Sequence, residues 1–170
     1  MHATYGDSIS VMRHEFYGEP IIPTTVIDGT DSVFIEFPPF LETYTQHIDF
    51  ARGFTPYFNL SINAATASLT TGTIDLRIVT ADTIPEGEIV AFVTILEDSL
   101  PGILEPSYTF DHVLRKMLQF PVDLVYPDSL DTTIVFTHDI PVDRMKTVIF
   151  IQDLNSKEVM QAILRPFEEE

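Results

Sequence analysis

Short runs of alternating apolar and polar residues dominate the chain from residue 57 onward. Within 73–81, every second residue from Ile74 to Ile78 is apolar and falls on one face of an extended chain. This is the period of a half-buried strand. Residues 89–96 are almost continuously apolar, as in a strand that is buried on both faces. Runs of these two kinds predict strands at 57–63, 73–81, 88–98, 132–138, 146–153 and 158–164.

Residues that favour turns separate these runs. Thr71-Gly72 and Pro101-Gly102 are examples, and residues 153–157 lie between two strand-like runs and therefore predict a hairpin. Many short strands at regular spacing are typical of an antiparallel sandwich, and not of a parallel α/β sheet. The sequence therefore predicts a mainly β fold, with an antiparallel, immunoglobulin-like β-sandwich over residues 56–167.

The first 55 residues follow a different pattern, and we assign 1–55 to a separate α/β segment. The pattern predicts, in order, a helix at 8–17, strands at 21–28 and 32–37, and a helix at 40–52. Prolines precede the second helix and Gly53 follows it, which are favourable start and stop signals. The last three residues, 168–170, are all glutamate, and they predict a frayed, solvated acidic tail.

Residues 107–120 fit two structures. Apolar residues at positions 110, 113, 114, 117 and 118 have the spacing of one helix face. The stretch from Asp111 to Leu118 also alternates as a strand would. The spacing favours a helix, and a strand stays open as the alternative.

The composition narrows the possible functions. The 170 residues include 26 acidic and 9 basic side chains, a formal net charge of −17, and no cysteine. A chain without cysteine has no disulfide, no thiolate metal site and no cysteine nucleophile. The acidic surplus disfavours nucleic acids and anionic membrane surfaces as partners, because both bind Lys and Arg. The longest apolar run is too short to cross a bilayer, so no transmembrane segment is expected, and residues 1–7 lack the pattern of a secretory signal.

The candidate metal ligands are carboxylates in two predicted loops. Asp28 with Asp31, and Asp128 with Asp131, offer the hard oxygen ligands that suit Ca²⁺. Neither loop has the spacing of an EF-hand, so the alternative is a pair of solvated acidic turns. The histidines form no zinc-binding spacing, and the chain contains no G-x-S-x-G or G-x-G-x-x-G motif. No other cofactor is expected.

One short stretch concentrates basic side chains. His112, Arg115 and Lys116 lie within five residues of each other in a strongly acidic chain. We expect Arg115 and Lys116 to neutralise nearby carboxylates, with Glu97, Asp98 or Asp111 as candidates. The alternative is a binding site for an acidic partner.

Three stretches carry a resemblance to a known family. Residues 93–99 (VTILEDS), 112–118 (HVLRKML) and 149–162 (IFIQDLNSKEVMQA) resemble, in this order, the C-terminal β-domain of the twenty-eight-kilodalton outer-membrane-protein-related family of Gram-negative envelopes. That family joins a thioredoxin-like domain to a β-sandwich and has no established enzymatic activity. The resemblance implies an extracellular or outer-membrane-associated protein.

The N-terminal segment resembles the second half of a thioredoxin fold. Tyr17-Gly18, Pro23-Thr24 and Asp28-Gly29 are similar to the strand region that carries the cis-proline of that fold, with Pro23 in the proline's place. The chain has no Cys-X-X-Cys helix, so redox chemistry through a thiolate is excluded.

Three hypotheses for the function follow. The first is a non-enzymatic structural or interaction protein of the envelope, which assembles through strand edges into homo-oligomers or filaments, or binds other envelope proteins. The second is a redox-inactive accessory protein that holds a peptide beside Pro23 and Thr24. The third is a hydrolase built from scattered carboxylates and histidines, which would need a carboxyl group with a raised pKa.

Overall fold

The computed structural model describes residues 8–18, 24–34, 40–102 and 108–170. The N-terminal segment contains helix α1 (Ser8–Tyr17), strands β1 (Thr24–Ile27) and β2 (Asp31–Phe34), and helix α2 (Phe40–Ala51). The sandwich contains the remaining elements: β3 (Phe58–Ala67), β4 (Thr71–Thr80), β5 (Ile89–Glu97), β6 (Leu100–Pro101), β7 (Thr109–Phe110), β8 (Val113–Pro121), β9 (Ser129–Thr137), the 3₁₀ turn η1 (Val142–Arg144), β10 (Met145–Asp153), β11 (Val159–Pro166) and β12 (Glu168–Glu169).

Two four-stranded sheets form the sandwich. Their strand orders are β11-β10-β5-β8 and β12-β3-β4-β9. All pairs are antiparallel except β12 with β3. The predicted fold class, mainly β with an antiparallel sandwich, is confirmed, and so is the hairpin at 153–157, which joins β10 to β11.

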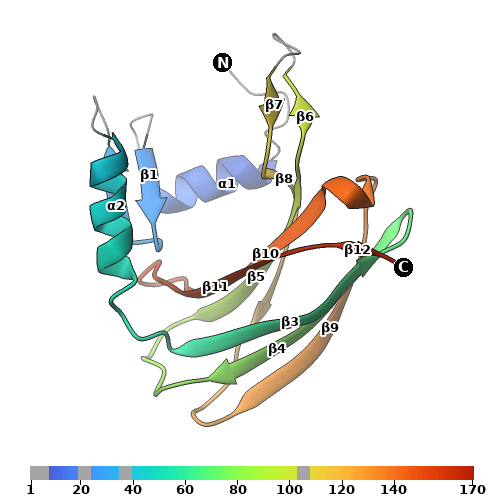
Figure 1. Ribbon diagram of the computed structural model, residues 1–170. Helices are drawn as coiled ribbons and strands as arrows, with labels where there is room; N and C mark the ends of the chain where they lie inside the picture. The colour runs from blue at the N-terminus through green and yellow to red at the C-terminus, as the bar shows by residue number, and fades with distance from the viewer. Residues whose placement is uncertain (1–7, 19–23, 35–39, 103–107) are drawn as a thin grey trace.

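The core lies between the sheets and follows the alternation seen in the sequence. Along β4 every second residue is buried, including Ile74, Leu76 and Ile78. Facing them from the other sheet are residues such as Val93 and Ile149, which are fully buried. Strand β5 is buried on both faces, because α1 covers part of its outer side. In Figure 1 α1, β1 and α2 lie on one side of the β10–β5 sheet, and β3, β4 and β9 lie on the other.

The helix favoured at 107–120 is wrong over its described residues, which form β7 and β8. Strand β8 pairs with β5, and the register shifts where Leu114 pairs with Leu96 but Lys116 pairs with Ile95. This bulge at Arg115 places Val113 and Leu118 on the same face of the sheet, five residues apart. In a regular strand without a bulge, residues five positions apart lie on opposite faces. The bulge therefore gives the apolar residues of this stretch a spacing similar to that of one helix face.

The frayed tail is also a wrong expectation. Glu168 and Glu169 pair in parallel with Thr66 and Ala67 of β3, and the main-chain N–H of Glu170 donates to the carbonyl of Ala67 at 3.2 Å. The preceding Phe167 is buried in the core, which fixes the direction of the chain next to β3. The glutamate side chains themselves are exposed.

Candidate functional site

The N-terminal segment is attached to the sandwich through Arg13 of α1. Its guanidinium lies over the stacked rings of Phe92 on β5 and Phe150 on β10, 5.1 and 5.4 Å from their centroids. It also donates a hydrogen bond of 3.0 Å to Oε1 of the fully buried Gln152. Burial lowers the pKa of Arg13, partly offset by Tyr17, whose hydroxyl oxygen Arg13 also contacts. Cation–π contacts and a buried hydrogen bond together hold α1 on the outer face of the sheet.

A second attachment joins the β1–β2 turn to the β10–β11 hairpin. The carbonyl of Asp28 accepts a hydrogen bond of 2.8 Å from the N–H of Val159. Gly29 has φ +79°, and a Cβ at this position would lie 1.8 Å from the carbonyl oxygen of Lys157. That carbonyl already accepts a hydrogen bond of 2.6 Å from Nε2 of Gln152. The close approach therefore requires a glycine.

Asp153 fixes the hairpin that receives this turn. Its buried carboxylate accepts main-chain hydrogen bonds from Glu88 at 3.0 Å, Asn155 at 3.0 Å and Ser156 at 3.3 Å. Burial alone would raise the pKa of Asp153, but the hydrogen bonds from Asn155, Ser156 and Glu88 outweigh it, and the pKa is lowered. The carboxylate is therefore a structural element of the hairpin.

The two attachments leave an open groove between the N-terminal segment and edge strand β11, which we call the junction groove. Its volume is about 720 Å³, within the range of ligand-binding sites. It is lined by the β1–β2 turn, the end of α2, the linker to β3, Asp82 and the start of β11: Ile27, Asp28, Thr30, Asp31, Phe50, Ala51, Arg52, Phe54, Thr55, Pro56, Tyr57, Asp82, Glu158, Val159, Met160, Gln161 and Ala162.

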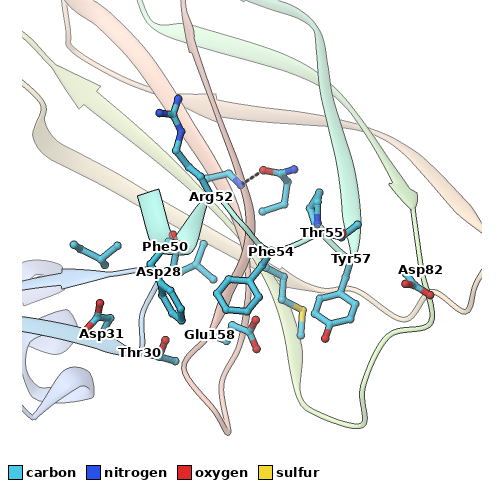
Figure 2. Close-up of a pocket in the computed structure, with 17 residues that line it drawn as sticks. Asp28, Thr30, Asp31, Phe50, Arg52, Phe54, Thr55, Tyr57, Asp82 and Glu158 are labelled. Atoms are coloured by element: carbon cyan, nitrogen blue, oxygen red, sulfur yellow. Dashed lines mark hydrogen bonds between the residues drawn. The ribbon is translucent and has the colours of Figure 1, made fainter. Parts of the chain in front are cut away.

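Aromatic rings and carboxylates together line the junction groove. Figure 2 shows Asp31 toward one end and Asp82 at the other, with three rings between them, those of Phe50, Phe54 and Tyr57. The rings of Phe50 and Phe54 touch edge to face with centroids 5.2 Å apart. They are nevertheless 69% and 66% exposed, so each offers a free face to the groove.

The open sides of the sandwich are bridged by long side chains. On one side, Nε2 of Gln161 donates to the carbonyl of Phe58 at 3.2 Å, and Arg165 donates to the carbonyl of Ile62 at 2.6 Å. On the other side, Nζ of Lys116 donates to the carbonyl of Thr137 at 2.8 Å. These contacts occupy main-chain groups at the strand edges, which are the groups that edge-to-edge assembly would use.

The residues predicted to bind a peptide and those predicted to bind an acidic partner lie on different elements: Thr24 is on β1, and Arg115 and Lys116 are on β8. Pro23 lies outside the described residues, and the main chain of Thr24 pairs with Phe34 in the β1–β2 hairpin. Arg115 pairs with Glu97, which is 4% exposed, and lies 3.7 Å from a carboxylate oxygen of Asp139. The expected pairing of Arg115 with a nearby carboxylate is therefore present. Lys116 bonds to a main-chain carbonyl instead of the expected carboxylate.

His112 lies in the bend between β7 and β8. This bend and the bend between β5 and β6 each donate a main-chain hydrogen bond to an aspartate of the other. The N–H of His112 donates to Asp98 at 2.8 Å, and the N–H of Ser99 donates to Asp111 at 2.9 Å. Lys146 pairs with the carboxylate of Asp98. Burial alone would raise the pKa of Asp98, but bonds from Lys146 and His112 lower it. His112 and Ser99 both have positive φ, so this cluster stabilises a pair of strained bends.

Two of the four carboxylates predicted to bind Ca²⁺ have side-chain partners in the protein. Asp31 contacts His47, and Asp131 pairs with Arg77. The main-chain carbonyl of Asp128 accepts hydrogen bonds from the N–H and the hydroxyl of Thr80. Asp28 lies near Asp31 in the junction groove. No group of three or more potential metal-ligating side chains occurs among the described residues, so the Ca²⁺ prediction gains no support.

Sequence reasoning missed the groove residues Phe50, Phe54, Asp82 and Glu158. The only available signal was Phe54-Thr55-Pro56, an aromatic, proline-containing linker at the junction of the two segments. Glu158 immediately precedes β11, about a hundred residues further along the chain, so no local pattern connects it with Phe54.

No helix within the described ranges is long and apolar enough to span a membrane.

Comparison with known proteins gives structural matches only. No family model and no curated protein matches the sequence. HBP35 of Porphyromonas gingivalis has a similar structure, with a TM-score of 0.77 and 11% sequence identity over 92% of this chain. A domain of the outer membrane lipoprotein Omp28 from the same organism has a TM-score of 0.48 at 13% identity, covering 69% of this chain and 93% of that domain. The chain spans 56% of HBP35 and shares with it a β-sandwich fold.

Proposed function

We propose that this protein is a non-enzymatic binding module of the bacterial cell envelope and that the junction groove is its binding site. The observation that carries the proposal is the way the groove is built. Residues from the β1–β2 turn, α2, the linker and β11 converge on it. The contacts of Arg13 and Gly29 hold its two walls in one arrangement, and such preorganisation lowers the cost of binding.

The envelope location rests on the resemblance of residues 93–99, 112–118 and 149–162 to the outer-membrane-protein-related family. That family's lack of established enzymatic activity also favours a binding role. A hydrolase would need a carboxyl group with a raised pKa. The two carboxyl groups with a shifted pKa in the described part of the chain, Asp98 and Asp153, are both shifted downward and hold bends of the main chain.

Assembly through strand edges receives less support than binding in the groove. The bridges made by Lys116, Gln161 and Arg165 occupy main-chain carbonyls at both open sides of the sandwich. A neighbouring strand would have to displace them. Self-assembly and the peptide site beside Pro23 stay predictions.

Nuclear magnetic resonance of the ¹⁵N-labelled protein tests the proposal. Short peptides of basic, acidic and neutral composition are titrated in, and the shifted amide resonances are mapped on the structure. We expect at least one peptide class to shift the resonances of Phe54, Glu158 and their neighbours in the groove. Shifts confined to other surfaces, or no saturable shift with any class, would overturn the assignment of the groove.

A further inference from the structure

We infer that the ligand of the junction groove is a basic segment of another protein, in which Lys or Arg side chains alternate with apolar ones. This inference rests on the proposed function and adds the chemical class of the partner. Four carboxylates line the groove, those of Asp28, Asp31, Asp82 and Glu158, against the single guanidinium of Arg52. In Figure 2 the Arg52 guanidinium points away from Glu158 and Phe54. The groove is therefore electrostatically complementary to a cationic partner.

Most of these carboxylates are free to bind. Asp31 contacts His47 of α2. Asp28, Asp82 and Glu158 form no ion pair within the described ranges of the chain. The carboxylate of Asp82 accepts a hydrogen bond from the main-chain N–H of Thr83 at 2.6 Å. The buried carboxylates of Glu97, Asp98 and Asp153 are engaged by protein partners, whereas the groove gathers, among the described residues, three unpaired carboxylates beside exposed aromatic rings.

The aromatic rings select a partner that also carries apolar side chains. Phe54 and Glu158 both line the groove (Figure 2), so one bound cationic side chain has a carboxylate and an aromatic ring available in the same site. Apolar side chains between the cations cover the exposed faces of Phe50 and Phe54. The acidic positions extend from Asp31 to Asp82 with rings between them, so more than one cation can be bound at a time.

Recognition takes place through side chains and not by addition of a strand to β11. The N–H of Val159 donates to the carbonyl of Asp28 at 2.8 Å, and the N–H of Ala162 donates to Oε1 of Gln161 at 2.9 Å. Two of the donors that strand addition would use where β11 lines the groove are thus already occupied. The partner's specificity then follows from its charges and apolar groups, and its main chain contributes little.

Titration calorimetry and ¹⁵N resonance mapping with capped hexapeptides test the inference. The probes alternate valine with lysine, serine or glutamate, and a fourth probe is the lysine peptide N-methylated at every second residue. We expect the lysine peptide to bind in the groove at least ten-fold more tightly than the serine peptide, and the glutamate peptide not to bind. The N-methylated peptide should bind within about two-fold of its parent. A ten-fold loss on N-methylation would overturn recognition through side chains.

Variants of the groove side chains test which of them contribute to binding of the lysine peptide. The double variant Glu158→Gln with Asp82→Asn should weaken binding of the lysine peptide about four- to twenty-five-fold, because each exposed ion pair contributes about two- to five-fold. Its matched control, Asp123→Asn with Glu169→Gln, removes the same charge from exposed positions outside the groove and should leave binding unchanged. Phe54→Leu should weaken binding, while Leu69→Ala, at a remote exposed position, should not. Equal losses in the variants and their controls would overturn the inference.

The outcomes separate the inference from the proposed function. If the serine and lysine peptides bind equally well in the groove, the basic partner is wrong and the groove remains a binding site. If the lysine peptide shifts only resonances outside the groove, the inference fails, and if no peptide class shifts groove resonances, the proposed function fails as well. Spermidine binding as tightly as the peptide would replace a protein partner with a small cation. Groove shifts that depend on protein concentration alone would identify a second copy of this chain as the occupant.

Discussion

Arg13 donates a hydrogen bond of 3.0 Å to the buried amide oxygen of Gln152, across 139 residues of the chain. The contact joins α1 to strand β10 of the β10–β11 hairpin. It places α1 over Phe92 and Phe150, and with Gly29 it sets the position of the wall that faces β11. The groove therefore depends on interactions outside its own lining.

Replacing Arg13 should detach α1 from the sheet. Arg13→Ala removes the cation–π contacts and leaves Oε1 of Gln152 without its partner, a loss of about 1–3 kcal/mol. Hydrogen–deuterium exchange should show α1 losing protection while β10 keeps it. Arg144→Ala, at an exposed position, is the matched control and should leave α1 protected. Unchanged protection of α1 in the Arg13 variant would contradict the role of this contact.

Two glycines with positive φ provide a steric test. Gly29→Ala places a Cβ 1.8 Å from the carbonyl oxygen of Lys157, whereas Gly18→Ala meets nothing within 4 Å. Both pay the cost of a left-handed conformation, about 1–2 kcal/mol. Only Gly29→Ala must also push the turn away from the hairpin. We expect urea denaturation and hydrogen exchange to show a larger effect at Gly29, and equal effects would refute the close packing.

The lowered pKa of Asp153 makes stability depend on pH in the acid range. In the unfolded chain an aspartate titrates near pH 3.9, and in the folded protein Asp153 titrates lower. Its contribution to stability is therefore complete above about pH 4 and is lost as the pH falls through the folded-state pKa. Asp153→Asn should lower stability at neutral pH and flatten the fall between pH 4 and pH 2, measured by urea denaturation at each pH. Asp123→Asn should keep the slope of the parent protein.

The Arg115–Glu97 pair tests whether Arg115 is structural. Glu97 is 4% exposed and the Arg115 side chain 32% exposed, so Arg115→Met leaves a nearly buried carboxylate without its partner. We expect a loss of up to about 3 kcal/mol. Adding Glu97→Gln should recover part of it, because the buried charge is then absent. A double-mutant cycle by chemical denaturation measures this coupling, and a value near zero would leave Arg115 free for a binding role.

The elements that the sequence predicts correctly have local causes. The alternation of Ile74, Leu76 and Ile78 is visible within one strand, and the turn at 153–157 is visible between two runs. The pairing of Arg115 with a carboxylate also follows from the composition, because basic side chains are few and carboxylates are many. The exceptions are β8, where a bulge shifted the apolar pattern, and the C-terminal glutamates, where the burial of Phe167 brought the chain beside β3.

What the sequence determines by itself is a set of strands, an α/β segment before them and a strongly acidic chain without thiol chemistry, because periodicity and composition depend on near neighbours. Tertiary structure alone decides where the unpaired charge lies. Asp31 and Phe54 meet Glu158 only after the β1–β2 turn has docked on the β10–β11 hairpin. Such contacts join residues more than a hundred positions apart, and their free energy appears only when both surfaces have formed.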